Sequence, residues 1–172
     1  MTLDEHDEPG FVAVEGDTAI AELARLAAEI WQEAFTYMIS GEQISYMLER
    51  FQSVPALTRQ IESEGYRYWF VSAGSETAGY LGVQPRGETL FLSKVYLLPA
   101  CRGQGLGTAM LRFAAEVARQ MGLRRLELTV NRKNPALGLY QREGFQIVRQ
   151  AVADIGGGFV MDDYILVREL DS

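Results

Sequence analysis

One stretch of the sequence, residues 94–107, combines an apolar strand, a glycine-rich turn and the beginning of a helix. Three glycines stand within five residues, at Gly103, Gly105 and Gly107. Glycines let several backbone N–H groups converge on an anion, and a helix that opens at Thr108 adds the partial positive charge of its N-terminus. Arg102 adds a full charge beside them. The stretch therefore predicts a phosphate-binding loop between a strand and a helix.

The elements around this loop predict a mixed α/β fold. An apolar stripe follows the loop as far as Gly122, and residues 126–130 are typical of a strand. A strand, a helix and a strand in this order imply a right-handed crossover and a parallel pair, with the loop at the carboxyl end of the first strand. Before the loop, alternating residues predict an antiparallel meander of three strands, at 68–73, 77–84 and 89–97.

The remaining segments complete a single domain over residues 10–172. Apolar residues at three- and four-residue steps predict helices at 18–35 and 42–51, and Asp17 is the expected N-cap of the first. Pro55 allows a further helical turn or two as far as Ile61. A weak strand at 11–14 precedes them. Asn134 and Pro135 are expected to open a short helix through Tyr140, and a hairpin over 145–153 and 164–169 closes the chain. The predicted sheet is mostly antiparallel, with about seven strands, a central parallel pair and about four flanking helices.

Composition narrows the function classes. The net charge of −7 over 172 residues argues against nucleic acid as the main partner and suits a cationic small molecule. No apolar run approaches the roughly 20 residues of a membrane span, and no charged and then apolar leader opens the sequence, so a cytoplasmic protein without a membrane anchor is expected. The single cysteine, Cys101, excludes an internal disulfide and fits a reducing compartment.

Residues 1–9 are expected to form a flexible acidic tail. Four acidic side chains surround His6, which is the lone histidine of the chain. A metal centre needs a set of ligands, and no second histidine exists to complete one. We therefore expect no metal in the site.

The glycine loop fits neither of two common phosphate-binding motifs. A dinucleotide-binding loop that begins at Gly103 needs a glycine at position 108, which is Thr108. A Walker-type loop needs a lysine directly after its last glycine, and none follows Gly107. The pattern that remains is Arg102-x-x-Gly105-x-Gly107.

This pattern, after a strand that ends in Leu98–Pro99, resembles the pyrophosphate loop of the GNAT family of N-acetyltransferases. A second segment, residues 134–145, resembles that family's other signature: an Asn, an Ala, a Leu-Tyr pair and a final Gly-Phe. The two segments stand in the family's order and at its separation, and the resemblance extends over about residues 66–170. It implies the GNAT fold and acetyl-coenzyme A as cosubstrate.

The resemblance also implies where the coenzyme binds. Amides of the loop and of the following helix would hold the pyrophosphate, at Arg102, Gly103, Gln104, Gly105, Leu106, Gly107 and Thr108. The pantetheine arm would lie along the preceding strand at Val95, Tyr96 and Leu97, with a bulge near Tyr96–Leu97 that separates this strand from its parallel neighbour. The other side of the arm would meet Asn131 or Asn134, Ala136 and Tyr140.

The implied reaction is direct attack of a primary amine on the thioester carbonyl. The backbone N–H of Val95 is the expected oxyanion donor, and Tyr140 is the expected acid for the leaving thiolate if its oxygen reaches the sulfur. The alternative for Tyr140 is a core tyrosine on a short helix. The strand before the loop carries no carboxylate, and Ser93 could at most hold a relaying water. The general base is therefore left unassigned.

Acceptor specificity is expected from the first two helices and the final hairpin. Their aromatic and acidic side chains would suit an alkylammonium group: Trp31, Phe35, Tyr37, Tyr46, Asp162 and Asp163. For Trp31 and Phe35 the alternative is the apolar core, and for the two aspartates the surface. Residues 31–48 are loosely similar to acetyltransferases of polyamines, which makes a small amine or polyamine the leading acceptor.

Three alternatives stay open at this point. The acceptor could be a protein N-terminus or a lysine side chain, or the chain could be a non-catalytic acetyl-coenzyme A sensor. Cys101 is either a small loop residue or a regulatory thiol beside Arg102. A homodimer is a further expectation, because dimers are common in the family.

Overall fold

Seven strands form one sheet in the order β1-β2-β3-β4-β5-β7-β6 in the computed structural model, which describes residues 8–36 and 39–170. The strands are β1 (Pro9–Ala13), β2 (Arg67–Ala73), β3 (Glu76–Arg86), β4 (Thr89–Leu97), β5 (Arg125–Asn131), β6 (Gln146–Gly156) and β7 (Phe159–Glu169). Only β4 and β5 pair in parallel, and the other neighbours are antiparallel. The predicted meander, parallel pair and closing hairpin are confirmed.

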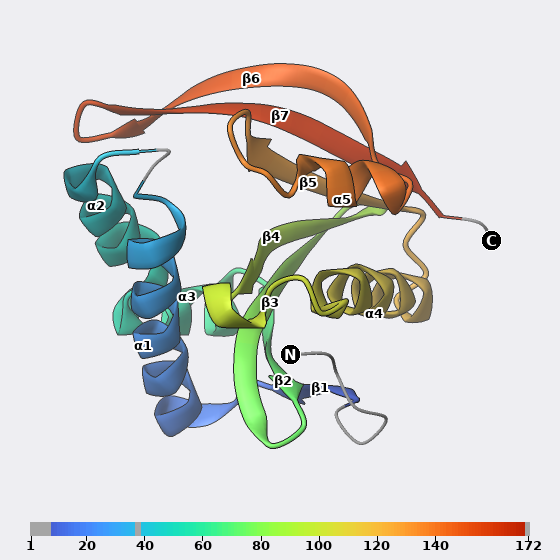
Figure 1. Ribbon diagram of the computed structural model, residues 1–172, viewed down its shortest axis with the longest axis horizontal. Coiled ribbons are helices and arrows are strands. Elements are labelled where there is room, and N and C mark those ends of the chain that lie inside the picture. Colours follow the sequence, from blue (N-terminus) through green and yellow to red (C-terminus); the bar gives the residue numbers. More distant parts are fainter. Residues whose placement is uncertain (1–7, 37–38, 171–172) are drawn as a thin grey trace.

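Helices cover both faces of the sheet (Figure 1). They are α1 (Gly16–Ala34), α2 (Gly41–Gln52), α3 (Val54–Ser63), α4 (Leu106–Gln120) and α5 (Leu137–Arg142), with a 3₁₀ turn η1 (Pro99–Cys101) after β4. The described part of the chain thus has five α-helices, one more than expected, because the segment after Pro55 forms a helix of its own. None of these helices is long and apolar enough to cross a membrane.

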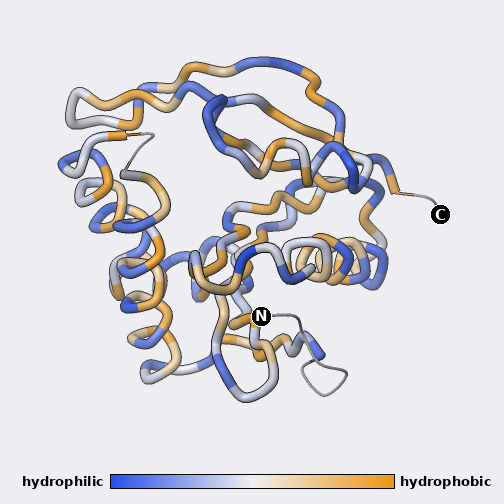
Figure 2. Tube along the Cα trace, in the orientation of Figure 1, coloured by the Kyte–Doolittle hydropathy of each residue, from blue (hydrophilic) through white to orange (hydrophobic). Residues whose placement is uncertain are grey.

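Each face of the sheet has its own apolar core. On one face α4 packs through Met110, Leu111 and Ala114 against buried residues of β3, β4 and β5. On the other face α1 packs through Leu23, Ile30 and its neighbours against aromatic residues of β2 and β3. Figure 2 shows the apolar residues recurring along α1 and α4, as the helical period requires.

A buried chain of hydrogen bonds fixes the helices on the α1 face. The indole Nε1 of Trp31 donates to the Tyr80 hydroxyl at 2.9 Å, and that hydroxyl donates to Gln52 Oε1 at 2.8 Å. The Tyr68 hydroxyl donates to Gln60 Oε1. These bonds join α1, α2 and α3 to the sheet and fix the positions of the three helices on the face opposite α4.

Three helices begin two residues away from the predicted start. The first begins at Gly16, whose φ of +85° suits glycine alone, so Asp17 lies in its first turn rather than at the N-cap. The fourth begins at Leu106 instead of Thr108.

The fifth helix begins at Leu137, two residues after the predicted proline. The side chain of Asn134 accepts a hydrogen bond from the N–H of Ala136 at 2.8 Å. Asn134 therefore closes a turn ahead of the helix, as Asn side chains commonly do in loops.

The closing hairpin is longer than predicted. Its strands continue to a turn at Gly157 and Gly158, which both have positive φ, of +63° and +81°. Such a turn matches the right-handed twist of the two strands and lets them extend to their full length. At the other end of the chain, Pro9 already belongs to β1 and pairs with Ala73, whereas residues 1–7, with His6, lie outside the described residues.

Candidate functional site

The parallel strands β4 and β5 separate where the glycine loop begins. Their pairing ends at Leu92 and Leu128, whereas β5 stays paired with β7 as far as Asn131 and Asp163. The second half of β4, up to Leu97, thus has one edge that β5 does not cover. An uncovered strand edge is a template for an extended ligand that carries amides.

The amides of this edge point into the gap. The N–H of Leu98 donates to the carbonyl of Ala78 on β3 at 2.8 Å. Because successive residues of a strand direct their backbone groups to opposite sides, Leu97 and Val95 direct theirs away from β3. The Leu97 carbonyl is accordingly reached by Arg102 Nη2, at 3.5 Å. The backbone of Val95 and the N–H of Leu97 are therefore available to a ligand.

The expected bulge lies at a different place. The pairing of β3 with β4 shifts between Gly82 and Val83, which pair with Lys94 and Leu92. Ser93 is therefore the extra residue, and Tyr96 and Leu97 pair regularly with β3. The resemblance placed the bulge about three residues too late. The separation from β5 starts at the same point, because a bulge increases the local twist and bend of a strand.

The glycine loop turns tightly into α4. Gly103 and Gly105 have φ of +76° and +82°, and Gly105 is the N-cap of the helix. A Cβ on Gly107 would lie 2.7 Å from Cδ2 of Leu139, so α4 and α5 approach closely here. The free N–H groups of the α4 N-terminus open beside this turn, which is the geometry of an anion site.

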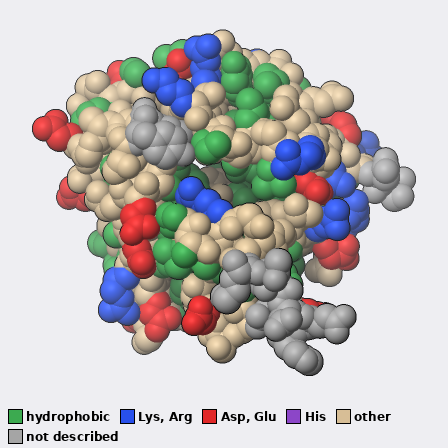
Figure 3. Space-filling view, viewed as in Figure 1, with side chains coloured by type: hydrophobic (Ala, Val, Ile, Leu, Met, Phe, Trp, Pro, Cys, Tyr) green, Lys and Arg blue, Asp and Glu red, His purple; other side chains and the backbone are tan. Residues whose placement is uncertain are grey.

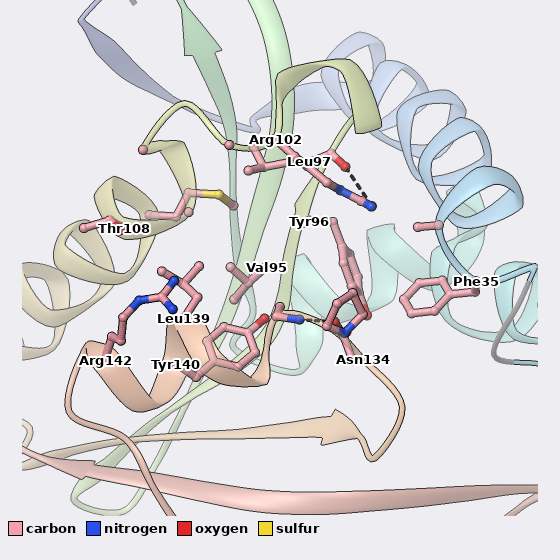
Figure 4. A pocket seen from close by; sticks show the side chains of 17 residues that line it. Phe35, Val95, Tyr96, Leu97, Arg102, Thr108, Asn134, Leu139, Tyr140 and Arg142 are labelled. Carbon is pink, nitrogen blue, oxygen red and sulfur yellow. Dashed lines mark hydrogen bonds between the residues drawn. The ribbon is translucent and has the colours of Figure 1, made fainter. Parts of the chain in front are cut away.

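A cavity of about 490 Å³ joins this loop to the strand gap, and we call it the glycine-loop groove. Figure 4 shows its wall from β4 with Val95 and Leu97, its end at Arg102 and Thr108, and its other wall from α5 with Leu139 and Tyr140. The lining residues that the sequence predicted are Val95, Tyr96, Leu97, Arg102, Gly103, Gly105, Gly107, Thr108, Asn134, Ala136 and Tyr140.

Three predicted coenzyme residues lie outside the lining of the glycine-loop groove. Leu106 has its side chain fully buried in the core, so only its backbone is available there. Gln104 directs its side chain to the carbonyl of Ala100, at 3.4 Å. Asn131 lines a second cavity instead.

This second cavity, of about 360 Å³, lies under the β6–β7 hairpin, and we call it the hairpin cavity. It meets the glycine-loop groove at the residues that line both, namely Phe35, Val95, Tyr96, Asn134 and Tyr140. Figure 3 shows the molecule hollowed between the α1–α2 side and the α4–α5 side of this face. Two connected spaces with Val95 and Tyr140 at their junction suit a reaction between two bound molecules.

The hairpin closes over this cavity because its tip is tied to α2. Gln43 Nε2 donates to the Val160 carbonyl at 3.0 Å, and the Tyr46 hydroxyl donates to the Ile155 carbonyl at 3.1 Å. In Figure 1 the hairpin arches across the molecule to α2. Tyr46, predicted as an acceptor contact, lines neither the groove nor the hairpin cavity, because its hydroxyl holds the tip of the roof.

The other predicted acceptor residues have different places. Trp31 and Phe35 line the hairpin cavity, but Trp31 is only 2% exposed and its indole N–H is bound by Tyr80. Asp162 faces outward and pairs with Arg132 at 3.3 Å, so it is not part of this cavity. Tyr37 lies outside the described residues.

Asp163 is the acidic residue that reaches the hairpin cavity. It is 7% exposed, and its Oδ1 has no hydrogen-bond partner. Burial, reinforced by the neighbouring Asp162 carboxylate, raises the pKa of Asp163 to about 6. A buried carboxylate with a free oxygen and a pKa near neutrality is suited to hold a cation and to accept its proton.

Lys94 is a cavity residue that the sequence analysis missed. It lines the hairpin cavity, and its Nζ donates to Ser93 Oγ at 2.6 Å. Burial, reinforced by the charge of Arg86, lowers the pKa of Lys94 to about 8. Two features of the sequence could have drawn attention to Lys94. The chain has 14 arginines but only two lysines, and this lysine interrupts an apolar strand.

Tyr140 is buried at the junction of the two cavities. Burial raises the pKa of its hydroxyl to about 12, so the side chain stays neutral at working pH and serves as a hydrogen-bond donor. Cys101 lies in the η1 turn, half-buried against the α4 core, and lines neither cavity. Residues 8–36 and 39–170 contain no group of three or more His, Cys, Asp or Glu side chains that could hold a metal ion.

Known proteins resemble the chain in sequence and in fold. The profile of the Acetyltransferase (GNAT) family matches residues 24–145. The uncharacterized N-acetyltransferase Rv2669 of Mycobacterium tuberculosis is 38% identical over 151 residues, which are 87% of this chain and 96% of that protein. The uncharacterized N-acetyltransferase YjgM of Escherichia coli is 37% identical over 98 residues, 54% of this chain but only 58% of that protein's length.

A solved structure shares the fold. The PaiA N-acetyltransferase of Thermoplasma acidophilum, in complex with coenzyme A, superposes with a TM-score of 0.76 over 95% of this chain and 99% of that chain, at 19% sequence identity. At this identity the likeness concerns the fold alone.

Proposed function

The chain belongs to the GNAT family of acetyltransferases, and we propose that it transfers the acetyl group of acetyl-coenzyme A to the primary amine of a small molecule. One observation carries the proposal: a glycine loop at the N-terminus of a helix and a roofed cavity with a buried carboxylate open onto the same uncovered stretch of β4. Donor and acceptor would thus meet at Val95 and Tyr140 in a ternary complex.

The groove has the features that coenzyme A requires. The N-terminus of α4 and the backbone of Gly103 and Gly105 would receive the pyrophosphate, with Arg102 as its counter-charge. The uncovered backbone of Val95 and Leu97 would pair with the amides of the pantetheine arm, which then directs the thioester toward the cavity junction.

The residues at the junction fit the chemistry of direct transfer. The N–H of Val95 would stabilise the oxyanion that forms when the amine attacks the thioester carbonyl. The Tyr140 hydroxyl would donate a hydrogen bond to the sulfur, and a proton as the thiolate leaves. Because its pKa is about 12, against roughly 8.5 for a thiol, we expect this transfer to be late and partial in the transition state.

The roof over the hairpin cavity favours a small acceptor. A cavity of about 360 Å³ with its hairpin tip bonded to α2 has room for a metabolite-sized amine, and a protein chain would have to displace the Gln43 and Tyr46 contacts. A small amine is therefore the leading acceptor, with a protein amine as the second candidate.

Removal of the Tyr140 hydroxyl should lower turnover more than substrate binding. We expect Tyr140→Phe to lower kcat by about 10- to 100-fold, within the usual range for a general acid, and to change KM for acetyl-coenzyme A by less than about threefold. Steady-state thiol release measures both constants. An unchanged kcat would remove Tyr140 from the mechanism.

A methyl group on the glycine loop should weaken coenzyme binding. Gly105→Ala forces alanine into a left-handed conformation, and we expect the loop to relax and the Kd for coenzyme A to rise about tenfold. Gly122→Ala is a matched control, since Gly122 also has positive φ and open space around its Cβ but ends α4 far from the loop. Calorimetric titration of both variants should show a weaker Kd for Gly105→Ala alone.

Acetyl transfer itself is tested by thiol release from acetyl-coenzyme A with a panel of primary amines. Coenzyme A binding is first confirmed by calorimetry, and the acetylated products are identified by mass spectrometry. Binding without thiol release from any amine or peptide would favour an acetyl-coenzyme A sensor and would reject the proposed enzyme.

A further inference from the structure

The hairpin cavity contains two opposite charges that do not neutralise each other. Lys94 lies on its β4 side and Asp163 on its roof side. The ammonium group of Lys94 donates two hydrogen bonds to Ser93, one to Oγ and one to the carbonyl oxygen. Its third N–H remains for a ligand. No ion pair in residues 8–36 and 39–170 involves Lys94 or Asp163. Both groups are therefore available to a ligand.

Each of these charges has a neighbour of the same sign. Asp162 precedes Asp163 on β7, and Arg86 on β3 acts on Lys94. Neither neighbour lines the cavity, so the Asp163 carboxylate and the Lys94 ammonium group themselves give it a negative side and a positive side. Such a cavity discriminates by the pattern of charge in a ligand as well as by its size.

The rest of the lining is mainly apolar. It includes Trp31, Phe35, Ile39, Met47, Phe51 and Met161. These side chains suit a short hydrocarbon skeleton and offer no further charge. The cavity therefore fits a compact molecule with an ammonium group at one end, a carboxylate at the other end and a few methylene groups between them.

We propose that the acceptor is a small zwitterion, an amino acid or a similar amine, whose ammonium group binds Asp163 and whose carboxylate binds Lys94. This inference rests on the proposed acetyl transfer and names its substrate class. A linear polyamine would place a second ammonium group near Lys94, where it would be repelled. The charge of Lys94 therefore favours a diamino acid over the diamine that is formed when the same amino acid loses its carboxylate.

Asp163 also completes the proton balance of the transfer. The amine nitrogen forms a bond to the acetyl carbon, and the bond between that carbon and sulfur breaks. The ammonium nitrogen loses two protons in the process. One goes to the Asp163 carboxylate and then to solvent, and the other replaces on Tyr140 the proton that Tyr140 gives to the sulfur.

Paired acceptors test the inference. Thiol release is measured with 2,4-diaminobutyrate, ornithine and lysine, and with their decarboxylated partners 1,3-diaminopropane, putrescine and cadaverine. We expect the wild type to favour at least one amino acid over its diamine by about tenfold or more in kcat/KM. Lys94→Met should abolish this preference, and Lys94→Arg should keep most of it.

Lys133→Met is the matched control, because Lys133 is the chain's only other lysine and is exposed outside the hairpin cavity. It should leave the preference unchanged. Equal or better use of the diamines by the wild type, or a preference that survives in a folded Lys94→Met variant, would overturn the zwitterion and leave acetyl transfer intact. No thiol release with any acceptor would overturn the proposed function, and the inference with it.

Discussion

Asp163→Asn should abolish most acetyl transfer while making the protein more stable. The amide can neither hold an ammonium group by charge nor accept its proton, so we expect kcat/KM for the acceptor to fall by about 10²- to 10⁴-fold, the usual contribution of a general base. Binding of coenzyme A should not change, because Asp163 lines the hairpin cavity and not the glycine-loop groove. Thiol release and calorimetry measure the two quantities separately.

The expected gain in stability follows from the pKa of Asp163. The folded protein raises this pKa from its ordinary value of 3.8 to about 6, so the folded state binds the proton more tightly than the unfolded chain. The free energy of unfolding therefore falls as the pH rises from about 4 to about 6, by up to about 3 kcal/mol for this group. Asparagine removes this loss, so the variant should melt several degrees higher at pH 8 and should gain little below pH 4.

Asp162→Asn is the matched control for this variant. It removes the same charge from the adjacent residue of the same strand, but Asp162 faces outward and pairs with Arg132. Its acetyl transfer should stay within about threefold of the wild type, since exposed ion pairs contribute little. Full activity of Asp163→Asn, or an equal loss in both variants, would contradict the role of Asp163.

Much of the fold could be predicted because its signals are local. The alternation in the meander, the apolar stripe of α4 and the Gly-rich turn of the hairpin each specify an element within a few residues. Helix starts were less accurate, because Gly16 and Gly105 begin their helices in left-handed conformations, and a glycine in a sequence does not by itself indicate which conformation it adopts. The bulge at Ser93 depends on the pairing of β3 with β4, which a pattern in one strand does not reveal.

The acceptor side could be predicted only in part, because it depends on how strands distant in the sequence pair and on which side chains they then direct into the cavity. Asp162 and Asp163 are identical neighbours, so composition does not tell which of them points into the cavity. The register of β7 with β5 places Asp163 inside and Asp162 outside. Tyr46 looked like a cavity aromatic, but the length of the hairpin brings Ile155 to its hydroxyl. The sequence of β4 does not reveal the charge partner of Lys94 in the cavity, because the acidic residue comes from β7.

The pH dependence of acetyl transfer should reveal both charges of the hairpin cavity. With a zwitterionic acceptor, kcat/KM should fall below about pH 6 as Asp163 becomes protonated, and above about pH 8 as Lys94 loses its proton. Near Asp163, burial keeps the pKa of Tyr96 above its usual value and that of Tyr140 at about 12, so neither titrates in this range. The charged neighbours Asp162 and Arg86 shift the pH at which each limb falls, but the limbs themselves arise from Asp163 and Lys94.

Two variants separate the limbs of this profile. Burial is the main cause of the raised pKa of Asp163, and the Asp162 carboxylate adds to it. Asp162→Asn removes this smaller contribution, so its acidic limb should move slightly to lower pH while the alkaline limb stays. Lys94→Met should lose the alkaline limb, and so should the wild type with a diamine, because no carboxylate then needs the lysine. An acidic limb that persists in the residual activity of Asp163→Asn would assign that ionisation to another group, and Asp163 would then bind the amine without taking its proton.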